Sequence, residues 1–357
     1  MPPHNKLADS SVAPLSIGLL KFSIRPVSKL IVPAVNKGNM LRGGFGHAFR
    51  RLCCVPQCRD ARSCPITDSC PYKQIFEPSP PPGAERLSKN QDIPRPFIFR
   101  PPHTTQTNFE HDESFEFELV LIGRAFDYLP YFVLSFRELA EGGLGLNRAR
   151  CTLDRVVVQT SVCGTRTFGV EETSECGTAL VYSNQDQLFR SVKPLHSTAL
   201  IDFRLRELQS ATGARESAIQ VSFLTPTYLK SDGKVIREPE FHHIFKRLRD
   251  RVNALSTFFG DDPLDVDFRG LGERSERIRK VAARFEWLDR ERTSTKTGQR
   301  HELSGFVGEA TYEGELEEFL PWLVVGELVH VGKHAPWGNG QLVVQRKAGS
   351  RIERERL

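Results

Sequence analysis

The sequence predicts an α+β protein made of two consecutive domains, each with the element order βαββαβ. Two observations carry this expectation. The same order of period-two and helical apolar patterns occurs in both halves of the chain. In addition, "LPYFVLSFRELAEGGLG" from Leu129 resembles "LPWLVVGELVHVGKHAPWGNG" from Leu320, which indicates a weak internal repeat. At 357 residues, 39% of them hydrophobic, the chain is long enough for two cores.

The first half begins with a strand pattern over 16–26, where alternate residues are apolar and Pro26 ends the run. From residue 40 the apolar residues recur every three or four positions, which predicts a helix. The apolar stripe of this helix comprises Leu41, Phe45, Phe49 and Leu52. Strands at 95–101 and 113–123, a helix at 128–143 and a strand at 150–159 complete the βαββαβ order, which is the ferredoxin-like plan.

The second half repeats the plan. A strand over 217–229 places Ile219, Val221 and Phe223 on one face, and an amphipathic helix follows at 241–259. A strand pair, a helix and a closing strand are expected at 284–294, 301–314, 315–329 and 340–346. The predicted domains are therefore 1–160, with a cysteine-rich insertion at 53–78, and 216–357, with a glycine-rich loop at 332–340. Residues 161–215 form the connection.

Charge and hydropathy restrict the class of protein. Charged residues make up 26% of the chain and the net charge is +5, which favours an acidic partner only mildly. No apolar run approaches the length of a membrane span, so a membrane partner is not expected. The first twenty residues lack the basic start and long apolar segment of a secretory signal. We therefore expect a cytoplasmic protein.

Five of the eight cysteines fall within 53–70. In a reducing cytoplasm such density indicates metal binding rather than disulfides. Cys54, Cys58, Cys64 and Cys70 have the spacing C-x3-C-x5-C-x5-C, and four thiolates suit a structural zinc ion or an iron–sulfur cluster. Cys53 is an alternative ligand to Cys54. Partly buried free thiols are the competing interpretation.

Two segments suggest contact with a polyanion. In 332–340, "GKHAPWGNG", the glycines allow close backbone approach to a phosphate and Lys333 adds charge, although a helix C-cap followed by a tight turn explains the glycines equally well. In the helix beginning near residue 40, helical spacing places His47 on one face with Gly43, Arg50 and Arg51, opposite the apolar stripe. A histidine beside arginines is suited to act as a base on a phosphodiester.

These segments together resemble a known family. The stretch 305–344, with its glycine-rich loop, is similar to the C-terminal signature of the CRISPR-associated endoribonucleases that process precursor CRISPR RNA, members of the RAMP superfamily. "LRGGFGHAFRRLCC" at 41–54, "CPYKQIFEP" at 70–78 and "VSFLTPTYLKSDGK" at 221–234 also resemble landmarks of the family, in the same order. The resemblance covers most of the chain and is weakest at 161–215.

The resemblance implies two ferredoxin-like domains that bind a CRISPR repeat RNA and cut it without a catalytic metal. In such enzymes the ribose 2′-OH attacks the adjacent phosphorus, leaving a 2′,3′-cyclic phosphate and a 5′-OH. His47 matches the catalytic histidine that the family often places in this helix, whereas His330 and His334 are rivals. The tyrosine that some members pair with the histidine is not evident. RNA contacts are expected from Lys37, Arg42, Arg50, Arg51, Gly332, Lys333, Gly338 and Gly340.

Two other functions remain open from the sequence. The same fold serves as a non-catalytic RNA-binding subunit of CRISPR effector complexes, whose other subunits would then be partners. A zinc-stabilised scaffold unrelated to RNA is the third interpretation. An RNA-cleaving enzyme is expected to lose its rate on His47→Ala while keeping its affinity for RNA.

Overall fold

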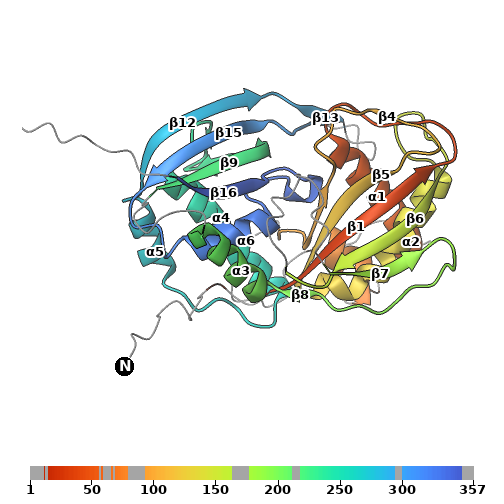
Figure 1. Ribbon diagram of the computed structural model, residues 1–357, viewed down its shortest axis with the longest axis horizontal. Coiled ribbons are helices and arrows are strands. Elements are labelled where there is room, and N and C mark those ends of the chain that lie inside the picture. The colour runs from red at the N-terminus through yellow and green to blue at the C-terminus, as the bar shows by residue number, and fades with distance from the viewer. Residues whose placement is uncertain are drawn as a thin grey trace, which may run out of the picture.

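The computed structural model describes Val12, 15–55, Cys58, Ile66, 69–78, 93–162, 177–210, 218–293 and 300–347. Two antiparallel sheets lie side by side, each with helices on one face (Figure 1). Within the described residues, no helix is long and apolar enough to cross a membrane.

The first domain has the predicted order. Its elements are β1 (Ser16–Pro26), α1 (Lys37–Cys53), β3 (Phe97–Arg100), β5 (Phe115–Ile122), α2 (Leu129–Gly142) and β6 (Cys151–Gln159). The sheet order is β3-β5-β1-β6, and all these neighbours are antiparallel. This is the ferredoxin-like arrangement, with the first strand between the third and the fourth. The short strands β2 (Leu30–Ile31) and β4 (Asn108–Phe109) pair beside it.

Aromatic rings fill the space between this sheet and its two helices. Phe45 of α1 stacks on Phe132 of α2 with 4.6 Å between ring centroids, and Phe49 and Phe136 pack around them. Each of these four side chains is fully buried, as the helical spacing predicts. Leu52 is the exception: 41% of it is exposed, so the prediction that it extends the stripe was wrong. The apolar stripe ends at Phe49, one turn before the helix does.

The second domain repeats the topology. Its elements are β9 (Ala218–Thr227), α4 (Phe241–Phe259), β12 (Arg279–Leu288), β15 (Gly305–Glu313), α6 (Leu320–Val329) and β16 (Leu342–Lys347), and the sheet order is β12-β15-β9-β16. Smaller elements surround them: the hairpins β10 (Leu229–Ser231) with β11 (Lys234–Ile236) and β13 (Glu291–Thr293) with β14 (Arg300–Glu302), and the helix α5 (Phe268–Ser275).

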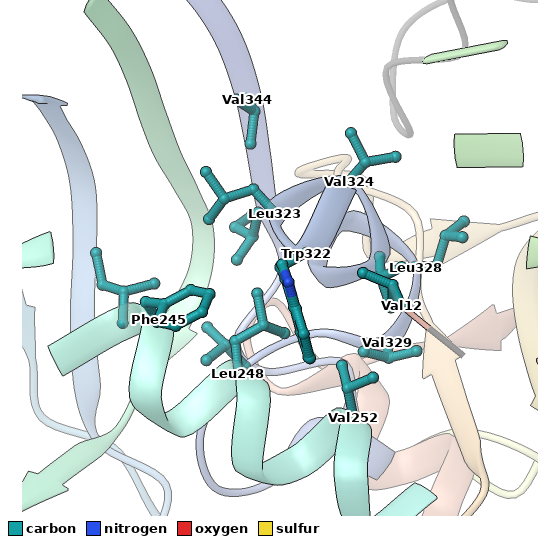
Figure 2. Packing of buried hydrophobic residues seen from close by; sticks show 14 of the residues in the cluster. Val12, Phe245, Leu248, Val252, Trp322, Leu323, Val324, Leu328, Val329 and Val344 are labelled. Atoms are coloured by element: carbon teal, nitrogen blue, oxygen red, sulfur yellow. The ribbon is translucent and has the colours of Figure 1, made fainter. Parts of the chain in front are cut away.

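Trp322 of α6 is the largest fully buried side chain. Figure 2 shows it between α6 and α4, near Phe245, Leu248 and Val252. The ring centroids of Trp322 and Phe245 are 5.8 Å apart in an edge-to-face contact. This packing joins the two helices that cover one face of the second sheet.

The connection is divided between the two domains. The strand β7 (Thr178–Ser183) extends the first sheet beside β6, and β8 (Leu195–His196) pairs with β1. The helix α3 (Ser197–Ser210) packs on α6. Arg204 of α3 forms an ion pair with the buried Glu327 of α6, with 3.1 Å between Nε and Oε2. The described residues 177–210 of the connection therefore contribute to both halves.

The two domains share apolar and polar contacts. Leu19, Ile98 and Val120, on the face of the first sheet away from α1 and α2, belong to the hydrophobic cluster of the second domain. The buried Arg100 of β3 reaches the end of α6, where it donates hydrogen bonds to the carbonyls of Glu327 (2.7 Å) and Leu328 (2.8 Å) and to Nε2 of His330 (3.0 Å). These contacts fix the second domain against the first.

Candidate functional site

A groove of about 900 Å³ lies between α1, the end of α2 and the loop that leads from α2 to β6. His47 lines it and is exposed, and the spacing of α1 places Gly43, Arg50 and Arg51 on the same wall. The opposite wall consists of Glu138, Leu139, 142–145 and Arg148. The structure thus brings together the face of α1 that the sequence singled out.

The glycines of α1 have different roles. A Cβ at Gly44 would lie 2.6 Å from the side chain of Leu139 in α2, and one at Gly46 would lie 2.4 Å from the ring of Phe76. Gly46 is thus constrained by the buried ring of Phe76, whereas Gly44, which also lines the groove, faces only the end of the Leu139 side chain. A Cβ at Gly43 would have no described neighbour within 4 Å. Gly43 therefore leaves open space on the α1 wall of the groove.

Three arginines give the groove a positive charge. Arg51 is paired across the groove with Glu138, with 2.5 Å between Nη2 and Oε1. The side chain of Arg51 is 65% exposed, so the pair is solvent-screened. Arg50 approaches the carbonyl of Cys58, with Nη2 at 3.4 Å. Arg148 is exposed on the opposite wall. The groove can therefore hold a phosphodiester beside an imidazole.

The end of this groove is formed by cysteines. Cys54 and Cys58 both line it, and their side chains share a hydrogen bond. Burial, together with the neighbouring Cys58 and Cys70, raises the pKa of the Cys54 thiol to about 11. Burial and the proximity of Cys70 and Cys54 raise the pKa of Cys53 to about 12. All four described thiols of this insertion are thus neighbours.

The structure does not by itself form a metal site there. Within the described part of the chain, no three His, Cys, Asp or Glu side chains are arranged to hold a metal ion. Cys64, the fourth predicted ligand, lies outside the described residues. The zinc and iron–sulfur expectations both stay predictions.

Two predicted RNA contacts lie inside the protein instead. Arg42 is 8% exposed, and its guanidinium lies 3.8 Å from the ring centroid of Trp337 and 4.5 Å from that of Phe76. Lys37 is 5% exposed, and its ammonium donates a hydrogen bond to the carbonyl of Thr104. Neither residue lines the groove. Lys37 lies four residues before Leu41 and Arg42 three residues before Phe45, so helical spacing places both near the apolar stripe. For Arg42, the neighbouring aromatic rings make burial of the cation favourable.

The C-terminal glycine-rich loop packs against the first domain. Gly332, Gly338 and Gly340 have positive φ values of 81°, 86° and 75°. A Cβ at Gly338 would lie 2.6 Å from the carbonyl oxygen of Phe99, and one at Gly340 would lie 1.8 Å from that of Val331. These glycines serve tight turns and protein contacts, which is the alternative that the sequence left open. Lys333 remains exposed, with its ammonium 5.4 Å from the ring centroid of Tyr228.

The rival histidines are elsewhere. His330 is fully buried: its Nδ1 donates to the carbonyl of Asn339 at 3.0 Å, and its Nε2 accepts from Arg100. Burial and the adjacent Arg100 hold its pKa well below the usual range, so it is a neutral packed histidine. His334 packs edge-on against Trp337, with 5.3 Å between ring centroids. Neither lines the groove of His47.

Sequence reasoning missed the second wall of the groove. Glu138, 142–145 and Arg148 come from the end of α2 and the loop after it, about 100 residues from His47 in the sequence. A signal was present, because the helix "LPYFVLSFRELAEGG" ends in glycines just as its C-terminal counterpart does. The packing of α1 on α2 that brings these residues opposite His47 is a tertiary contact that no local pattern shows.

Comparison with known proteins identifies family models that match each half of the chain. Residues 221–342 match the family of the CRISPR-associated endoribonuclease Cas6, and residues 15–186 match a family described as an N-terminal domain, AF_1859_N. An uncharacterized protein of Archaeoglobus fulgidus is 26% identical over 312 residues, which is 85% of this chain and 89% of that protein.

Two solved structures share the fold. A Cas6 product complex superposes with a TM-score of 0.51 at 17% identity, over 92% of this chain and 99% of that one. A partial Cas6-RT-Cas1–Cas2 complex gives a TM-score of 0.54 at 12% identity, over 94% of this chain and 46% of that one. The protein is thus one with tandem ferredoxin-like domains in the arrangement that Cas6 structures have. Residues 221–342 match the Cas6 endoribonuclease family, and the fold of the chain is the one that Cas6 structures have, so the resemblance seen in the sequence is confirmed.

Proposed function

We propose that the protein binds the repeat of precursor CRISPR RNA and cleaves it once in the groove of His47. The observation that carries the proposal is an exposed histidine in a basic groove of a chain with a Cas6-type domain. The fold that the chain shares with a Cas6 product complex supports it. CRISPR effector complex subunits are the proposed protein partners. Because the transcripts are cytoplasmic, we expect the enzyme there.

The proposed reaction is an internal transesterification. His47, as the general base, removes the proton of the ribose 2′-OH, and the resulting oxygen attacks the adjacent phosphorus. The bond from phosphorus to the 5′ oxygen breaks, and that oxygen takes up a proton from solvent. The products are a 2′,3′-cyclic phosphate and a 5′-OH. We propose that Arg50, on the same wall as His47, stabilises the negative charge that develops on the phosphate oxygens.

The test uses repeat RNA transcribed from the CRISPR arrays of the source genome. Cleavage is expected in EDTA, and it should stop when the nucleotide 5′ of the cut carries a 2′-deoxy ribose. His47→Ala should lower the single-turnover rate by roughly 100-fold or more while keeping RNA affinity. His111→Ala, an exposed histidine outside the groove, is the control. Cleavage of the deoxy substrate, or dependence on a divalent ion, would refute the mechanism.

We also propose that the cysteine-rich insertion binds a structural zinc ion. Support comes from the proximity of Cys54, Cys58 and Cys70 at the end of α1. Cys64 is the proposed fourth ligand on the basis of spacing, with Cys53 as the alternative. An iron–sulfur cluster is the second candidate for the same thiolates.

Metal analysis of the purified protein tests this proposal. About one zinc per chain is expected, and it should be lost in Cys58→Ser together with thermal stability. Iron with a visible absorption band would identify the cluster instead. A metal-free protein with unchanged stability in Cys58→Ser would show that the cysteines are free thiols.

A further inference from the structure

We propose that Gly43 and Arg148 hold the RNA strand beside His47 from the two walls of the groove. The bare backbone at Gly43 admits a ribose-phosphate unit against α1, and the guanidinium of Arg148 binds its phosphate from the α2–β6 loop. The inference rests on the proposed function, since it assigns positioning residues for that reaction.

The first observation is the contrast among the glycines of α1. A Cβ at Gly38 would lie 1.8 Å from the carbonyl oxygen of Trp337, and one at Gly46 would lie 2.4 Å from the ring of Phe76, whereas one at Gly44 would meet only the end of the Leu139 side chain. Packing inside the protein therefore accounts for Gly38 and Gly46, while Gly43 and Gly44 both line the groove. Gly43 has open space where its side chain would be, and this space is the groove.

A glycine in the middle of a helix is unfavourable relative to alanine, because it loses more backbone entropy on folding. At Gly43 no described contact of the protein offsets this loss. Gly142, at the end of α2, also lines the groove, and a Cβ there would likewise have no described atom within 4 Å. Because Gly43 and Gly142 have no side chains, the groove is wide enough for a polymer backbone at Gly43, one helical turn before His47.

The second observation is the way Arg148 is held. Leu144 and Ala149 exchange both backbone hydrogen bonds, at 2.9 and 2.8 Å, so the residues between them form a closed turn. The amide of Leu146 donates to the carbonyl of Ile31 at 2.8 Å, and Asn147 bonds the backbone of Lys29 and Ile31. This loop is therefore anchored to the strand β2.

Within this anchored turn, Arg148 adopts a left-handed conformation with φ of 49°, which non-glycine residues rarely do. Its side chain is exposed and lines the groove. No carboxylate of the described residues pairs with it, whereas Arg51 is paired with Glu138. A fixed backbone and an uncompensated guanidinium together suit an anionic ligand, and a phosphodiester fits the fork of arginine donors.

The experiment combines three variants and one control variant with the repeat RNA defined above. Gly43→Gln places a polar, helix-compatible side chain in the groove. We expect an unchanged or higher melting temperature together with a cleavage rate lowered by roughly 100-fold. Gly43→Ala should also keep or raise the melting temperature. Folded variants at this position show that a lower cleavage rate results from blocking of the groove and not from misfolding.

Arg148→Gln should weaken RNA binding and reduce the slope of log Kd against log salt by about 0.7, the value for one phosphate contact to single-stranded RNA. Arg150→Gln is the matched control, because Arg150 is exposed two residues away and does not line the groove. Its salt slope should equal that of the unchanged protein.

The outcomes separate the two proposals. If His47→Ala abolishes cleavage but Gly43→Gln cleaves at the normal rate, or Arg148→Gln keeps the full salt slope, the positioning inference is wrong and the proposed function stands. If the unchanged protein neither binds nor cleaves repeat RNA, both are wrong.

Discussion

Arg100 offers the sharpest test of how the two domains are joined. The perturbation is Arg100→Met, which keeps much of the aliphatic volume but removes every donor. The residue is 4% exposed, and burial lowers the pKa of its guanidinium to about 10, so it remains charged at neutral pH. It satisfies the carbonyls of Glu327 and Leu328 and the Nε2 atom of His330.

The magnitude follows from these partners. The substitution leaves three acceptors at the end of α6 without their donor, and each buried acceptor costs about 1–3 kcal/mol when unsatisfied. Arg100→Met also removes the cost of burying the guanidinium charge, and this gain offsets part of the loss. We therefore expect a loss of about 3–5 kcal/mol in the free energy of unfolding.

Urea denaturation followed by circular dichroism measures the effect, since the two domains share one apolar cluster and should unfold together. Arg25→Met is the control, because Arg25 pairs with Asp154 at 3.2 Å on the surface of the first sheet. That variant should lose less than about 1 kcal/mol. A loss for Arg100→Met no larger than that of the control would refute the role of Arg100 at the domain contact.

Three further predictions concern stability. The pKa of His330 is lowered in the folded state, so on acidification the unfolded chain protonates this histidine at a higher pH than the folded protein does. The free energy of unfolding should therefore fall as the pH drops below about 6.5, by up to about 1.4 kcal/mol per pH unit. His330→Gln should make the free energy of unfolding less dependent on pH in this range. Gly46→Ala should destabilise the protein by about 1–3 kcal/mol because its Cβ would collide with Phe76, whereas Gly43→Ala should stabilise it by about 0.5–1 kcal/mol. If thermal denaturation showed that both variants shift the melting temperature in the same direction, the difference in packing between the two positions would be refuted. Arg51→Gln should change the free energy of unfolding by less than about 1 kcal/mol, measured in urea, because its ion pair is exposed.

The fold was predictable because both domains follow periodic patterns. The strand at Ser16–Pro26 and the helix at Phe241–Phe259 match their predicted bounds, since alternation and helical spacing report which face is buried. The prediction for Leu52 was wrong because an apolar residue at helical spacing is buried only where another element covers that turn of the helix. The roles of β7 and α3 depend on which domain each element packs against. The periodicity of apolar residues carries no information about such tertiary contacts.

The candidate site was predictable on one wall only. Helical geometry alone placed His47, Arg50 and Arg51 together, and the groove contains all three. Arg42, an expected RNA contact, is buried in the structure, because an aromatic ring can stabilise a cation inside the protein. Arg148 was missed because only the packing of α1 on α2 brings it opposite His47.

One measurement tests the central claim most directly: single-turnover cleavage, in EDTA, of repeat RNA with and without one 2′-deoxy ribose at the cut. We predict that the all-ribose RNA is cut to a 2′,3′-cyclic phosphate and that the deoxy RNA stays intact, while His47→Ala binds both and cuts neither. Cleavage of the deoxy RNA, or full activity of His47→Ala, would contradict the assignment of the groove as the active site.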